Sequence, residues 1–82
     1  SLNTISQKLA HFLLKKASEN GQEFELKITR EELADAFSVA RPSLSRVFGE
    51  FTSGGIISQD GKKIKVLDED ALKRIMGEPA DL

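Results

Sequence analysis

The chain holds few of the side chains with which enzymes perform covalent or metal-dependent chemistry. It has one histidine, His11, and no cysteine, tyrosine or tryptophan. His11 has no H-x-x-x-H partner, so we expect no metal site. The carboxylate runs Glu31–Glu32 and Asp68–Asp70 fall where helices are expected to begin, and there they complement the helix dipole. Because no nucleophile with a base and no phosphate-cradling loop can be assembled, we expect no enzymatic activity.

The charged residues matter more by their distribution than by their sum. The net charge of −1 would by itself argue against phosphate binding. Over residues 40–67, however, five cations stand against two anions, whereas over residues 68–82 five anions stand against two cations. The sequence therefore contains a cationic segment beside an acidic one, and the cationic segment is the part suited to a polyanion.

Length and composition indicate one small globular domain. The 82 residues are 39% hydrophobic and 30% charged, a balance typical of folded proteins. No run approaches the roughly 18 apolar residues of a transmembrane helix, and we expect no membrane partner. The absence of cysteine fits a reducing compartment, so we expect a cytoplasmic location.

The first half of the chain predicts a helix, a short strand and a second helix. Apolar residues at i, i+4, i+7 and i+8 from Ile5 predict a helix over residues 5–18. Polar and apolar residues alternate over residues 23–28, which predicts a half-buried strand. Thr29 and Glu32 form the T-x-x-E capping box of a second, short helix.

The second half predicts a further helix, a hairpin and a last helix. Pro42 favours the first turn of a third helix, which Gly54–Gly55 ends. Asp60-Gly61 separates two β-prone runs, so we expect a hairpin over residues 56–67 with this dipeptide as its turn. Asp68 then caps a short helix. This order predicts an α+β winged helix-turn-helix, with a three-helix core, a β-hairpin wing and a short C-terminal helix. The whole chain, residues 1–82, would form this one domain.

The second and third helices have the spacing of a helix-turn-helix motif over residues 30–49. Ala34 is small where the two helices must approach each other, Val39 fills the turn, and Leu44 holds the third helix against the second. Ser38 stands where the motif usually has a glycine with positive φ. Serine adopts that conformation at some energetic cost, so the fold prediction is unaffected.

Three stretches together resemble the DNA-binding domain of Crp/Fnr-type bacterial transcription regulators. They read I-T-R-E-E-L-A-D-A-F at residues 28–37, A-R-P-S-L-S-R-V at residues 40–47 and I-S-Q-D-G-K at residues 57–62. The similarity extends from Ser6 to about Ile75. Members of that family carry an effector-sensing β-barrel and a dimerisation helix before this domain. The resemblance implies that this chain is the C-terminal part of a larger homodimer, with no cofactor of its own and with an effector, such as a cyclic nucleotide, in the missing part.

The resemblance also assigns a base-reading role to the third helix. Residues 41–52 would enter the major groove of double-stranded DNA. Arg41 and Arg46 would read bases or clamp phosphates, since a guanidinium pairs bidentately with O6 and N7 of guanine. Ser43 and Ser45 would donate to base edges or phosphates.

The remaining roles implied by the resemblance concern the DNA backbone. Thr29 and Arg30 match positions that hold phosphates at the start of the second helix. Lys62 and Lys63 would set the wing on the adjacent backbone. Pro42 stands where the best-known subgroup has an acidic base-reading side chain, so that subgroup's half-site is not expected here.

An alternative remains open on the residues alone. The near-neutral net charge also suits a winged-helix protein-protein interaction module without DNA binding, which would use an apolar patch. The wing lysines equally fit the protection of a β-edge from aggregation.

If the domain binds DNA, the resemblance implies a dimer that reads two half-sites, with RNA polymerase as a further partner. Three lysines of the first helix are interpreted as surface charge: Lys8, Lys15 and Lys16.

Overall fold

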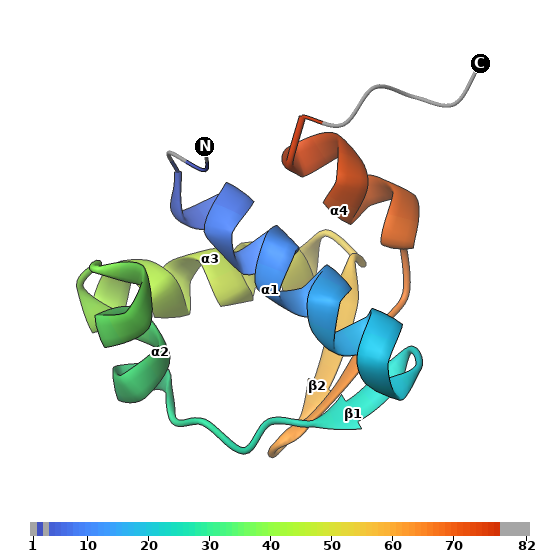
Figure 1. Cartoon of the computed structure of the whole chain (residues 1–82), viewed down its shortest axis with the longest axis horizontal. Coiled ribbons are helices and arrows are strands. Elements are labelled where there is room, and N and C mark those ends of the chain that lie inside the picture. The colour runs from blue at the N-terminus through green and yellow to red at the C-terminus, as the bar shows by residue number, and fades with distance from the viewer. Residues whose placement is uncertain (1, 3, 78–82) are drawn as a thin grey trace.

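The computed structural model describes residue 2 and residues 4–77 (Figure 1). Its elements are α1 (Ile5–Asn20), β1 (Glu23–Glu25), α2 (Arg30–Phe37), α3 (Arg41–Ser53), β2 (Ile57–Asp60), β3 (Lys63–Val66) and α4 (Glu69–Ile75). In Figure 1, α1 crosses over α3, the small sheet lies below them, and α4 packs beside α1. The predicted α+β winged helix is confirmed, with α3 over residues 41–53 against an expected 41–52.

One apolar core joins all seven elements. Leu44 of α3 is fully buried and packs in the same cluster as Leu9 of α1, Leu33 of α2 and Ile64 of β3. Each such aliphatic side chain contributes about 1.5–3 kcal/mol when it leaves water. The core contains no buried charged side chain within the part of the chain that the structure describes. The packing of leucines therefore fixes how α2 and α3 lie relative to each other.

The sheet is antiparallel, with β3 in the centre of the order β1-β3-β2. Alternation along β3 turns Ile64 toward the core and Lys63 toward solvent. The strand predicted over residues 23–28 was too long, since β1 ends at Glu25 opposite Lys63. Because β3 begins at Lys63, the chain beyond β1 has little left to pair with, and one hydrogen bond of 2.7 Å from the Leu26 amide to the carbonyl of Lys62 continues the contact.

The turn of the wing lies one residue later than predicted. Asp60 belongs to β2 and faces Lys63 across the strands, so the loop consists of Gly61 and Lys62. Gly61 has a φ of +58° at the first loop position, where a two-residue hairpin requires the left-handed region that glycine adopts without strain. This register puts Lys62 at the tip of the wing and Lys63 within a strand.

Two lysines of α1 make contacts that their interpretation as surface charge missed. The Nζ atom of Lys8 donates to the carbonyl oxygen of Phe37 at 2.8 Å and so satisfies an otherwise open carbonyl at the end of α2. The Nζ atom of Lys16 lies 5.7 Å from the ring centroid of Phe12. Lys8 thus fastens α1 to the helix-turn-helix across 29 residues of sequence.

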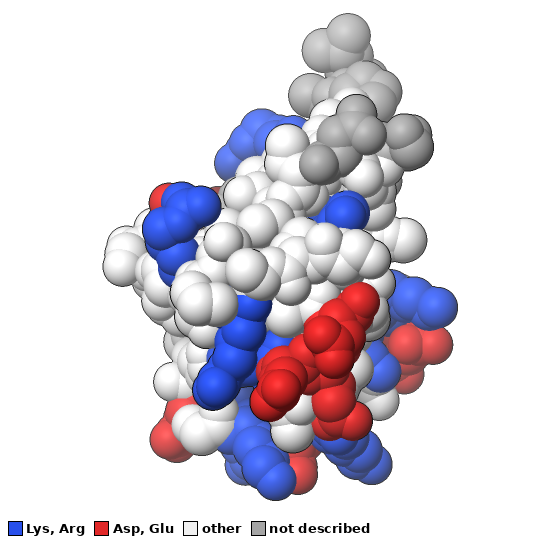
Figure 2. Space-filling model, turned by 90° about the vertical axis from the view of Figure 1, so that its left-hand side faces the viewer, with Lys and Arg blue, Asp and Glu red and all other residues white. Residues whose placement is uncertain are grey.

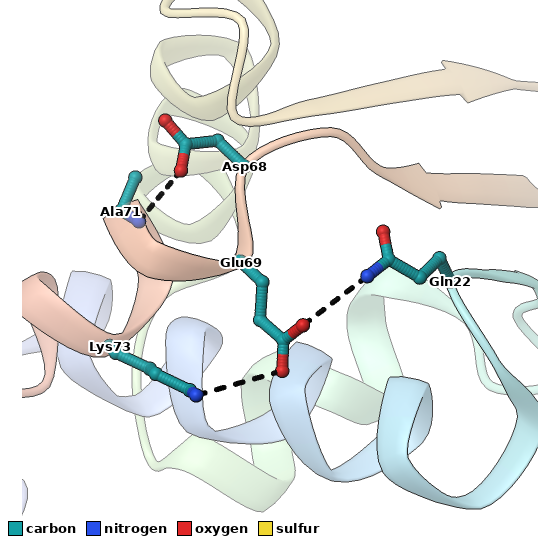
Figure 3. A network of polar contacts seen from close by, with 5 residues as sticks. All are labelled: Gln22, Asp68, Glu69, Ala71 and Lys73. Carbon is teal, nitrogen blue, oxygen red and sulfur yellow. Dashed lines mark hydrogen bonds and ion pairs between the residues drawn. The ribbon is translucent and has the colours of Figure 1, made fainter.

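Polar contacts fasten α4 to the rest of the domain (Figure 3). The carboxylate of Asp68 accepts a hydrogen bond from the amide of Ala71 at 3.0 Å, which confirms the predicted cap. Glu69 accepts from the side-chain amide of Gln22 at 3.2 Å and lies 3.9 Å from Lys73. Since Gln22 directly precedes β1, its bond to Glu69 joins the start of α4 to the edge of the sheet.

The turn between α2 and α3 has the positive φ expected at its serine. Ser38 has φ 58° and ψ 44°, and its amide donates to the carbonyl of Asp35 at 3.0 Å. The amide of Val39 donates to the carbonyl of Ala34, also at 3.0 Å. These bonds close the end of α2, and the strain at Ser38 is the cost of the sharp change of direction.

Replacement of Ser38 by glycine is expected to raise the free energy of unfolding by about 0.5–1 kcal/mol. A left-handed conformation costs a residue with a Cβ atom about 1–2 kcal/mol, and about 0.5–1 kcal/mol of that gain is offset by the greater freedom of glycine in the unfolded chain. Urea denaturation followed by circular dichroism measures the change. Ser38→Ala keeps the Cβ atom and serves as the control, and a gain in that variant of the same size would contradict the explanation.

The capping box of α2 predicts a pH dependence. The amide of Thr29 donates to the Glu32 carboxylate at 3.0 Å, and the amide of Glu32 donates to the Thr29 hydroxyl at 3.0 Å. These backbone and side-chain hydrogen bonds with Thr29 lower the pKa of Glu32 below its ordinary value of 4.5. The ionised carboxylate therefore stabilises the fold above the unfolded-state pKa, and this contribution is lost as the pH falls through the lowered folded-state pKa.

We therefore expect the free energy of unfolding to fall less between neutral and acidic pH in Glu32→Gln than in the unmodified chain. Glutamine keeps the capping geometry but does not titrate. Urea unfolding midpoints at pH 7 and pH 3 should therefore differ less in Glu32→Gln than in the unmodified chain. Glu31→Gln, outside the capping box, is the matched control and should retain the full difference. An acid dependence of Glu32→Gln equal to that of the unmodified chain would refute a role for this carboxylate.

Candidate nucleic-acid interface

The exposed side of α3 carries the residues predicted to read bases. Leu44, Val47, Phe48 and Phe51 face the core, so the opposite side of the helix faces solvent. On that side Ser45 and Arg46 are exposed, Arg41 is exposed at the first residue of the helix, and Ser43 is half-buried at the margin. The structure therefore brings all four predicted residues of α3 onto its first turns, with Ser43 less accessible than the others.

The two arginines of α3 differ in their partners. A terminal nitrogen of Arg46 lies 3.4 Å from a carboxylate oxygen of Glu50, one turn along the same helix, and both side chains are more than half exposed. Such a surface pair contributes about 0–1 kcal/mol, so Arg46 can exchange it for another anion at little cost. Arg41 forms no ion pair within residues 4–77, which leaves its guanidinium open to a ligand.

The start of α3 lacks a side-chain cap. Thr4, Thr29 and Asp68 each accept a hydrogen bond from the helix that follows them. Ala40, at the corresponding position before α3, has no side chain able to do so. Pro42 has no N–H, so the amides of Arg41 and Ser43 are left for water or a ligand. A helix N-terminus with open amides attracts anions.

Arg30, at the start of α2, is held against the aromatic ring of Phe48. Its Cζ atom lies 3.6 Å from the ring centroid, and no ion pair to this guanidinium occurs in the described ranges. Burial lowers the pKa of Arg30, and the neighbouring charge of Arg41 lowers it further. Arginine nevertheless stays protonated at neutral pH. Two unpaired cations from two helix starts therefore lie close enough to repel each other.

A groove of about 300 Å³ separates the start of α2 from the wing. It unites three predicted phosphate-binding residues, Thr29, Arg30 and Lys62, and adds Lys27, which the sequence analysis missed. The position of Lys27, two residues before the helix cap, was the available signal. The hydroxyl of Thr29 accepts a bond from Glu32 and still has a proton to donate. The full lining is Leu26, Lys27, Ile28, Thr29, Arg30, Gln59, Gly61 and Lys62.

Lys63 is not brought together with this group. It lies on the outward face of the sheet, where its cross-strand neighbours are Glu25 and Asp60. A separate shallow cavity of about 220 Å³ on that face has both acidic and basic lining residues. Lys63 thus shares its surroundings with carboxylates, whereas Lys62 at the tip does not.

Figure 2 views the side of the molecule that carries α2 and the start of α3. Acidic side chains gather in one patch there, with basic side chains around it. The exposed acidic residues of α2 are Glu31, Glu32 and Asp35. This face of α2 is unsuited to phosphate, so an anionic ligand would meet the basic margins formed by the helix starts and the wing.

The described residues form neither a metal-binding cluster nor a membrane-spanning helix. Within residue 2 and residues 4–77, no group of three or more histidine, cysteine or acidic side chains is arranged to hold a metal ion. None of the helices described has the length and apolar character needed to span a bilayer.

Comparisons with known proteins identify the family. Residues 7–75 match the model of the Crp-like helix-turn-helix domain. The transcriptional activator protein anr of Pseudomonas aeruginosa is 30% identical over 83 residues, which cover 94% of this chain and 34% of that protein. The catabolite activator protein of Thermus thermophilus is 25% identical, with a TM-score of 0.73, and the match covers 92% of this chain and 35% of that one.

A further solved structure shares the fold at lower identity. FixK2 of Bradyrhizobium japonicum has a TM-score of 0.82 at 20% identity, over 96% of this chain and 40% of that one. The chain thus spans about a third of the length of the curated relatives that it matches. Those relatives are transcription regulators. The chain is a Crp-like helix-turn-helix domain and belongs to the Crp/Fnr family of transcription regulators.

Proposed function

We propose that this domain reads double-stranded DNA, with α3 in the major groove and the start of α2 and the wing on the flanking backbone. The observation that carries the proposal is the set of cations at the two helix starts and the wing tip. Arg30, Arg41 and Lys62 make no ion pair within the described residues, and Arg30 and Arg41 repel each other. A phosphate backbone would relieve that repulsion, and the release of its counterions would favour binding.

The candidate side chains form two groups, one placed to contact base edges and the other to contact phosphates. Arg41, Ser43, Ser45 and Arg46 lie on the first turns of α3 and are suited to base edges, since a recognition helix contacts bases through its N-terminal residues. The open amides after Ala40 suit a phosphate at the same place.

The second group of side chains is suited to contacts with the DNA phosphate backbone. Thr29, Arg30 and Lys62 line one groove and are suited to phosphates, with Lys27 as an addition. Lys63 would make a weaker phosphate contact than Lys62, because Glu25 and Asp60 lie across from it on the neighbouring strands. Phosphate contacts fix the register of the domain on the duplex, and the base contacts supply specificity.

For the whole protein, we propose that this domain is one part of a cytoplasmic homodimer that reads two half-sites about one helical turn apart, with RNA polymerase as a further partner. The relatives named as transcriptional activators support this, as does the fraction of their length that the chain spans. The function is binding rather than catalysis, and the effector would act on another part of the protein.

A titration of the domain with a mixed-sequence DNA duplex, followed by amide NMR at low salt, tests the proposal. Non-specific affinities of about 10⁻⁴–10⁻⁶ M lie within its range. We expect shifts at residues 29–30, 41–46 and 60–63 that fade as salt is raised. Resonances that stay unmoved at millimolar duplex would overturn DNA binding by this domain and favour the protein-interaction module instead.

A further inference from the structure

The guanidinium of Arg30 lies over the ring of Phe48, which is a residue of the core. Phe48 is only 3% exposed, so one side of its ring belongs to the core, and the guanidinium of Arg30 lies 3.6 Å from its centroid. A planar guanidinium stacks on an aromatic face while its N–H groups remain directed outward in the plane. The stack therefore restrains the side chain without using any of its hydrogen-bond donors.

The two residues come from the two helices of the motif. Arg30 is the first residue of α2, and Phe48 lies in the third turn of α3. The ring thus reaches from the buried side of the proposed reading helix to the proposed phosphate-binding arginine. Leu44 also lies on the buried side of α3, but its side chain is aliphatic and could not stack on the guanidinium of Arg30.

We propose that Phe48 is a positioning residue for DNA binding, which fixes the Arg30 guanidinium at a set place relative to the reading surface of α3. This inference rests on the proposed function. Arginine loses much side-chain freedom when it binds a phosphate. Because the stack already removes part of that freedom, Arg30 binds more tightly than an unrestrained arginine would.

The position also couples the two groups of DNA contacts. Arg30 lines the groove with Thr29 and Lys62, whereas Arg41 and Arg46 lie on the exposed side of α3. Because the Phe48 ring belongs to α3 and holds Arg30, it fixes the distance between the phosphate-binding guanidinium and the reading helix. The acidic neighbours Glu31 and Glu32 do not pair with Arg30 within the described residues, so the ring is what orients it.

A double-mutant cycle tests the inference. The unmodified domain, Phe48→Leu, Arg30→Gln and the combined variant are titrated with one mixed-sequence duplex at low salt, and each affinity is corrected for the folded fraction. Leucine preserves most of the apolar packing but offers no π face. We expect Phe48→Leu to weaken binding about fivefold when Arg30 is present and to have no effect beyond about 1.5-fold in the Arg30→Gln background.

Phe51→Leu is the matched control. Phe51 lies on the same helix, is also 3% exposed and does not stack on Arg30 in the described part of the chain. Its replacement should lower the unfolding midpoint as Phe48→Leu does, yet leave the affinity of the folded domain unchanged. An equal loss of affinity in Phe51→Leu would make the effect of Phe48 a general loosening of α3 and overturn the inference.

The outcomes separate the inference from the function on which it rests. No binding by the unmodified domain overturns the proposed function and the inference with it. Binding by the unmodified domain, with a Phe48→Leu effect that is absent or equal in both Arg30 backgrounds, overturns the inference alone. If Phe48→Leu does not fold, Phe48→Met provides the test in both Arg30 backgrounds, because methionine also fills the core without offering a π face. A fivefold loss supports positioning by Phe48, and undiminished affinity overturns it.

Discussion

Exchange of Arg41 for glutamine is expected to weaken binding to duplex DNA about tenfold, within the range of about 1–3 kcal/mol for loss of one arginine contact. Arg41 is exposed at the first residue of α3, beside the uncapped amides that follow Ala40. It forms no ion pair in the described ranges, so its charge is fully available to DNA. Fluorescence anisotropy against a labelled duplex measures the affinity over a series of salt concentrations.

The salt dependence gives a second, independent readout of the same variant. If Arg41 clamps a phosphate, its loss should reduce the slope of log affinity against log salt by about one, and if it contacts only a base edge, the slope should stay unchanged. Lys73→Gln on α4 is the matched control, since it removes one positive charge that pairs with Glu69 away from the helix starts. Equal losses of affinity in Arg41→Gln and Lys73→Gln would show that net charge alone governs binding and would contradict a built interface.

Arg46→Gln should cost less than Arg41→Gln. Arg46 must first leave Glu50, at 3.4 Å, and this cost offsets part of its attraction to DNA, whereas Arg41 has no such pair to break within the described residues. If the order of the two variants were reversed, Arg46 would be the principal reading residue of α3.

The order of elements was predictable because its signals are local. The predicted capping box at Thr29 lies within four residues of sequence and is present in the structure, and α1 begins with a second capping box of equal span at Thr4. The positive φ at Ser38 followed from the motif spacing. In each case the stabilising hydrogen bonds connect near neighbours, so the sequence pattern contains the whole interaction.

The errors arose where pairing between distant segments decides the structure. The end of β1 at Glu25 is set by the start of β3 at Lys63, which no pattern within residues 23–28 contains. The one-residue shift of the wing turn has the same origin, and register errors of this size move side chains to the opposite face. The shift of the wing turn places Lys62 at the tip and Lys63 on the sheet, whereas the sequence assigned the same role to both lysines.

The candidate site shows the same division. The exposure of Ser45 and Arg46 on α3 follows from helical periodicity, because Leu44 and Val47 point to the core, whereas Arg41 is exposed as the first residue of the helix. The contact of Arg30 with Phe48 joins two helices, and the bond from Lys8 to Phe37 spans 29 residues. Such contacts depend on how helices pack, which a single sequence does not reveal.

Truncation of Leu44 to alanine is expected to lower the free energy of unfolding by about 3–4 kcal/mol. Leu44 is fully buried at the centre of the core that holds α3 against α1, α2 and the sheet. Buried leucine-to-alanine changes cost about 2–5 kcal/mol, because the lost apolar contacts add to the cavity that remains. A domain of this size has only about 4–12 kcal/mol of stability in total, so the variant should populate unfolded chains at ambient temperature and lose DNA binding in proportion.

Leu67→Ala provides the same chemical change without the burial. Leu67 is 52% exposed, so its truncation should stay within about 0.5 kcal/mol. Urea unfolding midpoints, with equal denaturant slopes, give both values on one scale. A loss below about 1 kcal/mol in Leu44→Ala would mean that α3 is held by contacts other than its leucine core. Since the same helix carries Arg41 and Arg46 on its exposed side, that result would also remove the packing argument for a rigidly presented reading surface.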